Sequence, residues 1–121
     1  GGGKIINIGS GYSIKAAAGN AAYAASKAGL WNMTRSMALA WGKDNIQVNM
    51  ILPGWIKTEM TTKRLGDIKI KNKIISETPA GRVGKPEDIT GAAVFLASGA
   101  SDFVTGEFIN IDGGLKAGDK G

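Results

Sequence analysis

Two short apolar runs decide the fold of this chain: KIINI at residues 4–8 and IQVNMIL at residues 46–52. Each is rich in β-branched residues and each is followed by turn residues, Gly9 after the first and Pro53-Gly54 after the second. We therefore expect two buried strands that end in turns. The segment between them at residues 21–42 is rich in alanine and contains no proline, which predicts a long helix. A strand, a helix and a second strand form a βαβ unit, whose strands are parallel and whose crossover is right-handed.

The predicted helix carries its large apolar residues in its second half. Helical spacing places four of them on one face: Leu30, Met33, Met37 and Trp41. The first half is rich in alanine and therefore thin, so that another helix could approach it closely.

The remainder of the chain extends the same pattern. Residues 55–85 are basic and read as irregular. Pro86 opens a second helix, because proline and the two acids that follow it suit a first helical turn. Residues 106–112 read as a third strand, and we expect residues 116–121 to fray. The pattern predicts one α/β domain over residues 1–121, with three parallel strands and helices on both faces of the sheet.

The chain lacks both cysteine and histidine, and this excludes several kinds of site. Without cysteine there is no disulfide framework, thiolate metal site or cysteine nucleophile, and without histidine there is no Ser-His-Asp triad or histidine-ligated zinc. The acidic residues are scattered, so we expect no metal site. No apolar stretch is long enough to span a bilayer, so we expect no membrane partner and a cytoplasmic protein.

The charge balance raises one further class of partner. The chain has 15 basic and 10 acidic residues, a net charge of +5, and such an excess can indicate nucleic-acid binding. The lysines concentrate in the irregular segment, without interleaved aromatic residues or a recognised module. We therefore expect no nucleic-acid partner.

Four positions are expected to meet at the carboxyl edge of the sheet. Tyr23 and Lys27 lie four residues apart, so they share one helix face. A cation beside a phenol favours the phenolate, which makes tyrosine usable as a general acid or base. Ser10 follows the first strand and Gly54 follows the second, and ligands of open α/β sheets bind outside these strand ends. On spacing alone the alternative stays open: a helix-packing tyrosine, a solvated lysine and a turn serine.

A second pattern at the same place resembles a phosphate-binding loop. Residues 9–14 read GSGYSI, which begins like the dinucleotide motif G-x-G-x-x-G. The third glycine is replaced by Ile14, and the next helix begins too late. We interpret the segment as a turn that exposes Ser10.

Several separate stretches together resemble the C-terminal half of a short-chain dehydrogenase/reductase. The resemblance runs from Gly3 to about Leu115 and is carried by KIINIGS at 4–10, YAASKAG at 23–29, IQVN at 46–49, PGWIKT at 53–58, PAGRVGKPEDI at 79–89, VTGE at 104–107 and DGG at 112–114. The YAASKAG stretch contains the family's Tyr-x-x-x-Lys motif, and its distance from Ser10 fits. The fold so implied is a partial, Rossmann-like doubly wound layer.

The resemblance implies a hydride transfer between a nicotinamide cofactor and a small carbonyl or alcohol substrate. Tyr23 would exchange a proton with the substrate oxygen, Lys27 would favour the phenolate and bind the nicotinamide ribose, and Ser10 would donate to the carbonyl. The nicotinamide end would be held by the residues Tyr23, Lys27, Pro53, Gly54, Ile56 and Thr58. Residues 55–85 would form the substrate lid, whose lysines suggest an anionic substrate such as a sugar acid.

The resemblance also implies a cofactor, NAD or NADP, and a homo-oligomer. The family's glycine-rich phosphate loop, the residue that distinguishes NAD from NADP, and the Asn-Ala-Gly strand end are absent from this chain. A second hypothesis therefore stands beside the enzyme: a fragment that folds and self-associates without binding nucleotide, because its uncovered strand edge and helix faces favour association.

Overall fold

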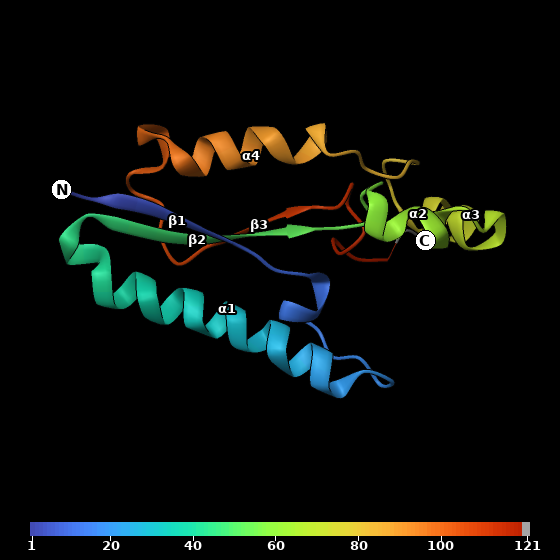
Figure 1. Ribbon diagram of the computed structural model, residues 1–121, viewed down its shortest axis with the longest axis horizontal. Coiled ribbons are helices and arrows are strands. Elements are labelled where there is room, and N and C mark those ends of the chain that lie inside the picture. The colour runs from blue at the N-terminus through green and yellow to red at the C-terminus, as the bar shows by residue number, and fades with distance from the viewer. Residues whose placement is uncertain (120–121) are drawn as a thin grey trace.

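The computed structural model describes residues 1–119. Its sheet has three parallel strands in the order β1-β2-β3: β1 at Gly3–Ile8, β2 at Ile46–Pro53 and β3 at Phe108–Ile111. Two helices cover the sheet, with α1 (Ala21–Trp41) on one face and α4 (Glu87–Ala97) on the other (Figure 1). The predicted fold class, an α/β layer of three parallel strands with helices on both faces, is confirmed.

The central strand forms the core because it is covered on both faces and paired on both edges. Val48, Met50, Ile51 and Leu52 of β2 are fully buried, and Leu96 of α4 packs above them with 1% exposure. Register is fixed by pairs such as Ile5 with Val48 on one side of β2. Such a strand reads as a continuous apolar run, which is why the sequence pattern identified it.

Helix α1 contacts the sheet through a different face from the one that its large apolar residues predict. Its buried residues are Ala24, Thr34 and Ala38, whereas Met33 is 49% exposed. Small side chains let the helix axis approach the sheet, and the Thr34 hydroxyl is paired there with the Leu30 carbonyl and the Asn7 amide. Leu30 and Met37 of the large apolar stripe are half-buried, so that stripe lies beside the buried face and not at its centre.

The segment expected to be irregular contains two helices. They are α2 (Glu59–Leu65) and α3 (Ile68–Glu77). The Asp67 carboxylate caps α3 by accepting from the Lys69 N–H, and α2 has an acid in its first turn and two cations in its last. These capping residues could have been recognised in the sequence, but the many lysines led us to expect an irregular segment.

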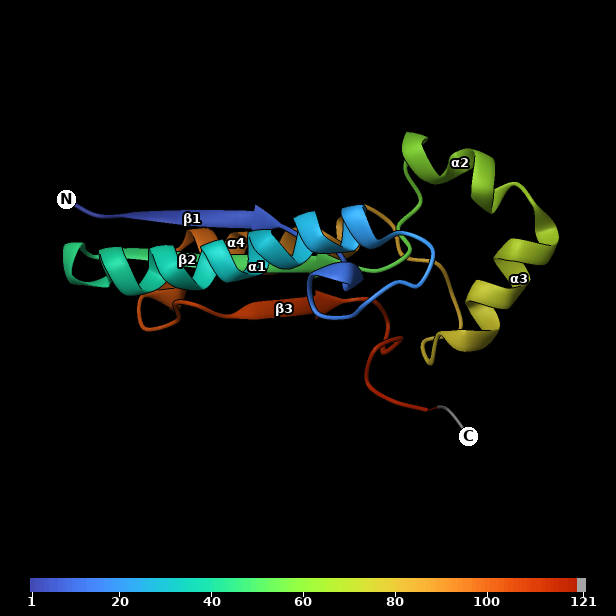
Figure 2. The same ribbon diagram turned by 90° about the horizontal axis from the view of Figure 1, so that it is seen from below.

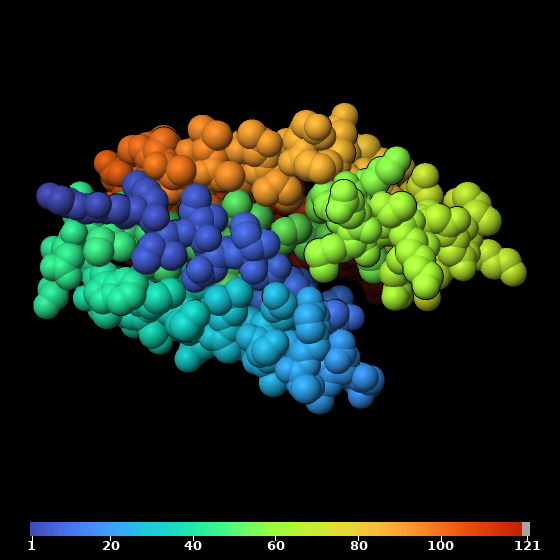
Figure 3. All heavy atoms as spheres, in the orientation of Figure 1, coloured from blue at the N-terminus to red at the C-terminus, as the bar shows by residue number. Residues whose placement is uncertain are grey.

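We call residues 57–77 the arm, and β1, β2, β3, α1 and α4 the body. The arm extends beyond the carboxyl edge of the sheet and turns away from the body (Figure 2). In the space-filling view its atoms form a separate lobe at that end of the molecule (Figure 3). The site expected at this edge therefore lies where the arm joins the body.

Short 3-10 turns complete the chain: η1 (Gly11–Ser13) after β1, η2 (Gly42–Asp44) after α1 and η3 (Gly99–Ser101) after α4. Within the tail that was expected to fray, Lys116 is instead held, because its ammonium lies 2.8 Å from the Asp112 carboxylate and its side chain is 10% exposed. The last two residues of that tail lie outside the described part of the chain. Within residues 1–119, none of the helices combines the length and apolarity needed to cross a bilayer.

Candidate functional site

Ser10 lies at the level at which β2 ends. The Gly9 N–H donates to the Ile51 carbonyl at 2.9 Å, which extends the pairing of β1 by one residue. A side chain at Gly9 would place its Cβ 2.6 Å from Met50 Sδ and 2.7 Å from Leu52 Cδ2. Only glycine lets the chain pass this close to β2, and the close passage sets the position of Ser10.

The Ser10 hydroxyl oxygen accepts a hydrogen bond but its proton is uncommitted. Ser10 caps η1, and its Oγ accepts from the Tyr12 N–H at 3.0 Å. Its own N–H donates to Ser13 Oγ at 3.2 Å, which closes a reciprocal capping box. Within residues 1–119 the hydroxyl proton has no acceptor. The turn therefore leaves Ser10 able to donate a hydrogen bond to a bound molecule.

Tyr23 and Lys27 occupy the first turns of α1. The Lys27 ammonium lies 5.6 Å from the centroid of the Tyr23 ring, and Tyr23 is 42% exposed. Neither the phenol hydroxyl nor the ammonium forms a hydrogen bond or ion pair with any residue of the described chain. Both polar groups are therefore available to a ligand.

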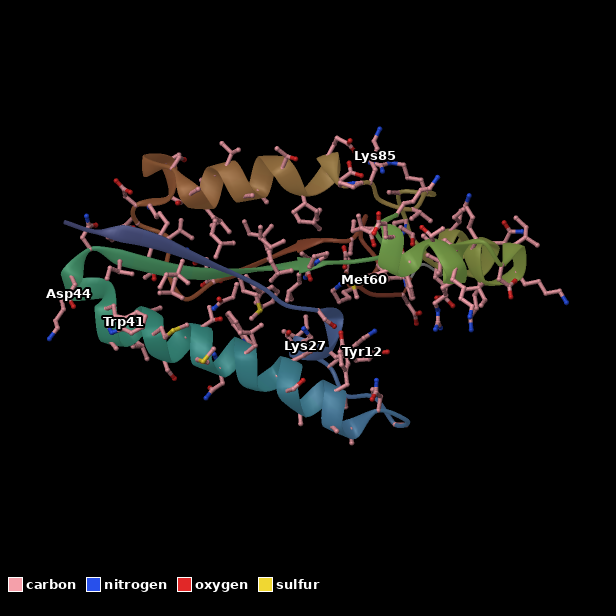
Figure 4. All side chains as sticks on the ribbon, in the orientation of Figure 1. Tyr12, Lys27, Trp41, Asp44, Met60 and Lys85 are labelled. Carbon is pink, nitrogen blue, oxygen red and sulfur yellow. The ribbon has the colours of Figure 1, made fainter. Side chains whose placement is uncertain are left out.

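Tyr12, which the sequence analysis did not single out, joins these residues. Its ring meets the Tyr23 ring edge to face, with centroids 5.7 Å apart and an interplanar angle of 82°. Tyr12 and Lys27 lie beside one another in the angle between η1 and α1 (Figure 4). Because the backbone N–H of Tyr12 donates to Ser10 Oγ while its ring contacts Tyr23, Tyr12 links the serine turn to the start of α1. The available signal was an aromatic residue two positions after the predicted serine.

The predicted cofactor residues Pro53 and Gly54 lie at the end of β2. Pro53 is the last residue of the strand, and the Gly54 N–H donates to the Ile111 carbonyl at 2.8 Å. A Cβ on Gly54 would lie 2.5 Å from the Cβ of Asp112. The ends of β2 and β3 can approach this closely only because residue 54 is glycine.

Ile56 offers an unpaired backbone donor beside this turn. It forms a bridge with Gly84, and its carbonyl accepts from Thr61 Oγ1 at 2.6 Å. Its N–H has no acceptor in residues 1–119. An amide oxygen such as that of a nicotinamide carboxamide would satisfy this donor, so the residues present fit the cofactor that the resemblance implies.

Thr58 lies where the arm begins. It precedes α2, its N–H donates to Thr61 Oγ1 at 2.9 Å, and its side chain is exposed, with Oγ1 3.4 Å from Thr61 Oγ1. The four predicted cofactor residues at this edge thus run in order from the last residue of β2 to the root of the arm.

A cavity of about 290 Å³ lies beside the same strand ends. It is lined by Trp55, Ile56, Thr78, Ala80, Arg82, Gly84, Asp88, Asn110, Ile111, Asp112, Gly113 and Gly114. Burial acts to raise the pKa of Asp112, but hydrogen bonds from Lys116 Nζ and the Gly114 N–H outweigh it and hold the pKa below its usual value. The Arg82 guanidinium binds both oxygens of Asp88, at 2.7 and 2.9 Å, which lowers the pKa of that carboxyl. These pairs fix the cavity walls.

A parallel three-stranded layer with helices on both faces defines the class of the fold: a Rossmann-like α/β layer. The family model described as "Enoyl-(Acyl carrier protein) reductase" matches residues 1–116. The chain belongs to the short-chain dehydrogenase/reductase family.

Individual relatives share its sequence over nearly its whole length. Gluconate 5-dehydrogenase of Gluconobacter oxydans (strain 621H) is 44% identical over 113 residues, which are 93% of this chain and 44% of that protein. The 3-oxoacyl-[acyl-carrier-protein] reductase FabG of Chlamydia trachomatis is also 44% identical over 113 residues, 93% of this chain and 45% of its own.

A solved structure shows the same arrangement in space. A gluconate 5-dehydrogenase from Burkholderia cenocepacia J2315, in complex with NADP and tartrate, superimposes with a TM-score of 0.91 at 41% identity. The match covers 97% of this chain and 46% of that structure. The chain therefore spans less than half the length of the relatives that it matches.

Proposed function

We propose that this chain carries the catalytic half of an NAD(P)-dependent oxidoreductase that interconverts a carbonyl and an alcohol on a small molecule. One observation carries the proposal. The Ser10 hydroxyl proton, the Tyr23 hydroxyl, the Lys27 ammonium and the Ile56 N–H have no partner within residues 1–119, and all of them belong to the carboxyl edge of the sheet. Ile56 is 8% exposed, and a buried backbone donor of this kind normally has an acceptor, so its unpaired N–H favours a ligand at this edge.

The nicotinamide cofactor, when bound, supplies or accepts the hydride. In the reducing direction the Tyr23 hydroxyl donates its proton to the substrate oxygen as charge develops there, a role worth about 10²–10⁴-fold in rate. The Ser10 hydroxyl donates a hydrogen bond to the same oxygen and stabilises that charge. Lys27, 5.6 Å from the Tyr23 ring, stabilises the phenolate that remains.

The same residues and the adjacent backbone would hold the nicotinamide end of NAD or NADP. Lys27 has three N–H donors for the ribose, and the Ile56 N–H is available to the carboxamide. Pro53, Gly54 and Thr58 would contribute at the end of β2 and the start of the arm. The bound NADP named for the Burkholderia neighbour supports a nicotinamide cofactor as the proposed ligand.

For the substrate we propose a sugar acid. The dehydrogenase from Gluconobacter is named for gluconate, and the Burkholderia structure contains tartrate, another hydroxy acid. The arm beside the site carries an excess of positive charge, which suits a carboxylate. The relationship to FabG makes an acyl substrate the competing choice.

A second candidate is a fragment that self-associates, into a homo-oligomer, without binding nucleotide. The sheet favours it because β1 and β3 each pair with only one strand of the described chain. Apolar side chains on its helices and turns are also exposed, with Leu39 at 87%, Val94 at 61% and Phe103 fully exposed. Such surfaces lead chains to associate.

A titration with NADH and NADPH, followed by nicotinamide fluorescence, separates the two candidates. The enzyme predicts saturable binding that Lys27→Ala weakens about ten-fold and that Tyr23→Phe, which removes one hydroxyl, weakens less. Lys43→Ala, which removes an exposed cation at the other end of α1, is the matched control and should have no effect. Absence of saturable binding at any usable concentration, with the chain folded, would leave the associating fragment.

A further inference from the structure

The arm carries positive charge that the fold does not neutralise. Residues 57–73 contain six cationic and two acidic residues. One of the acids, Asp67, already accepts the Lys69 and Ile70 N–H groups at the start of α3. The three ion pairs formed within residues 1–119 all lie outside the arm. Lys63 and Arg64 suit the last turn of α2, but no ion pair within residues 1–119 neutralises any cation of the arm.

One of these cations is held in place. The guanidinium carbon of Arg64 lies 5.3 Å from the centroid of the Trp55 ring. Trp55 is half-buried, lies between Gly54 and Ile56 in the chain, and lines the 290 Å³ cavity. Arg64 is exposed, as the arm's lysines are, but it alone among the arm's cations contacts an aromatic ring, and that contact restricts its side chain.

The ring contact leaves the N–H donors of the guanidinium without a protein acceptor in residues 1–119. The aromatic ring attracts the positive charge but takes up none of the five donors in a conventional hydrogen bond. Within the described residues, Arg64 forms no hydrogen bond and no ion pair. A planar fork of unused donors matches the two oxygens of a carboxylate, and pre-ordering reduces the entropy lost on binding.

We propose that Arg64, ordered by Trp55, binds the carboxylate of an anionic substrate and so determines substrate specificity. The inference rests on the proposed function, because it places the acid group of the substrate next to the Gly54–Ile56 backbone that would hold the nicotinamide. Trp55 acts as a positioning residue. Lysine at position 64 would keep the charge but lose both the flat face and the fork.

The test is an NMR titration of the 121-residue chain with gluconate, and with sorbitol as its uncharged counterpart. The indole N–H signals of the three tryptophans are observed, and Trp55→Phe assigns that of Trp55. We expect gluconate to shift the Trp55 signal saturably and sorbitol to give no saturable shift. Arg64→Gln should raise the gluconate Kd about ten-fold or more, and Arg64→Lys should raise it nearly as much.

Lys63→Gln is the matched control, because it removes the same charge from the neighbouring exposed residue of α2. It should change the Kd less than two-fold. Equal effects of Lys63→Gln and Arg64→Gln would show that diffuse charge, and not a fixed guanidinium, attracts the acid. Equal binding of sorbitol, or no saturable gluconate binding by the folded parent, would also overturn the proposal.

The NADH titration keeps the two proposals apart. The chain could bind gluconate in an Arg64-dependent way and yet bind no nicotinamide cofactor. That result would support the carboxylate site and contradict the proposed dehydrogenase. The chain could instead bind the cofactor in a Lys27-dependent way and yet bind no gluconate. That result would support the dehydrogenase and contradict the role proposed for Arg64.

Discussion

The body and the arm differ in how far their apolar side chains are buried. In the body, Met50, Ile51 and Leu52 are fully buried and the buried polar groups are paired. In the arm only Leu65 and Ile74 are buried, while Met60 is 95% and Ile68 64% exposed. The difference indicates that the body supplies most of the free energy of folding and that the arm contributes little to the core. Four predictions test this division.

The largest difference is expected between two methionines. Met50→Ala in β2 should lower the free energy of unfolding by about 2–5 kcal/mol, because it leaves a cavity in a filled core. Met60→Ala in α2 should change it by less than about 0.5 kcal/mol. Urea unfolding of both variants measures the contrast, and comparable losses would show that the arm contributes to the core.

Two asparagines give the next contrast. The Asn49 side chain is 1% exposed, donates to the Val104 carbonyl at 2.9 Å and accepts from the Glu107 N–H at 3.1 Å. Asn49→Leu leaves the Val104 carbonyl and the Glu107 N–H without their side-chain partner. We therefore expect the free energy of unfolding to fall by about 2–3 kcal/mol. The same change at the exposed Asn72 of α3 should cost almost nothing in the same urea experiment. Tolerance of Asn49→Leu would mean that water reaches those groups.

Acid should weaken the body through Asp112. Its pKa is lower in the folded chain than in the unfolded one, so the carboxylate stabilises the fold above the ordinary carboxyl pKa of about 3.9. That contribution is lost as the pH falls through the lowered pKa. Asp112→Asn should therefore be less stable than the parent at pH 7, with the gap closing below about pH 4. Thermal unfolding across this range measures the gap, and a gap independent of pH would exclude the ion pair as its cause.

The smallest effect is expected in the arm. Glu59 lies in the first turn of α2, where a negative charge favours the helix by about 0.3–1 kcal/mol. Glu59→Gln should speed amide hydrogen exchange in α2 by a few-fold and leave β2 unchanged, because the arm opens locally. An equal acceleration in both would show that body and arm unfold as one unit.

The body was predictable because its signals are local and repeated. Continuous apolar runs marked β1 and β2, and a proline followed by two acids marked the start of α4. The two helices of the arm were not predicted because α2 and α3 are short and rich in lysine, which hides an apolar spacing. One local signal was Asp67, a residue type that favours the start of a helix such as α3. The spacing of the large residues did not identify the sheet-facing side of α1, because burial there follows the small side chains of Ala24 and Ala38.

The site could be predicted only in part. Ser10, Tyr23 and Lys27 follow from motif spacing, and their roles stay predictions. The Tyr12–Tyr23 and Trp55–Arg64 contacts depend on how loops return to the sheet, and no local pattern encodes such a path. Both contacts join a residue at a strand end to one on a helix, which is where side-chain direction depends on tertiary structure.

The parallel order of the strands also sets how the chain must fold in time. No two strands are joined by a hairpin, so each pairing waits for a long loop to close. Asn49 and Glu107, which meet across β2 and the start of β3, are 58 positions apart. Until that closure the apolar run of β2 has an open edge in water. Refolding should therefore be slow for a chain of this length and should lose yield steeply as protein concentration rises.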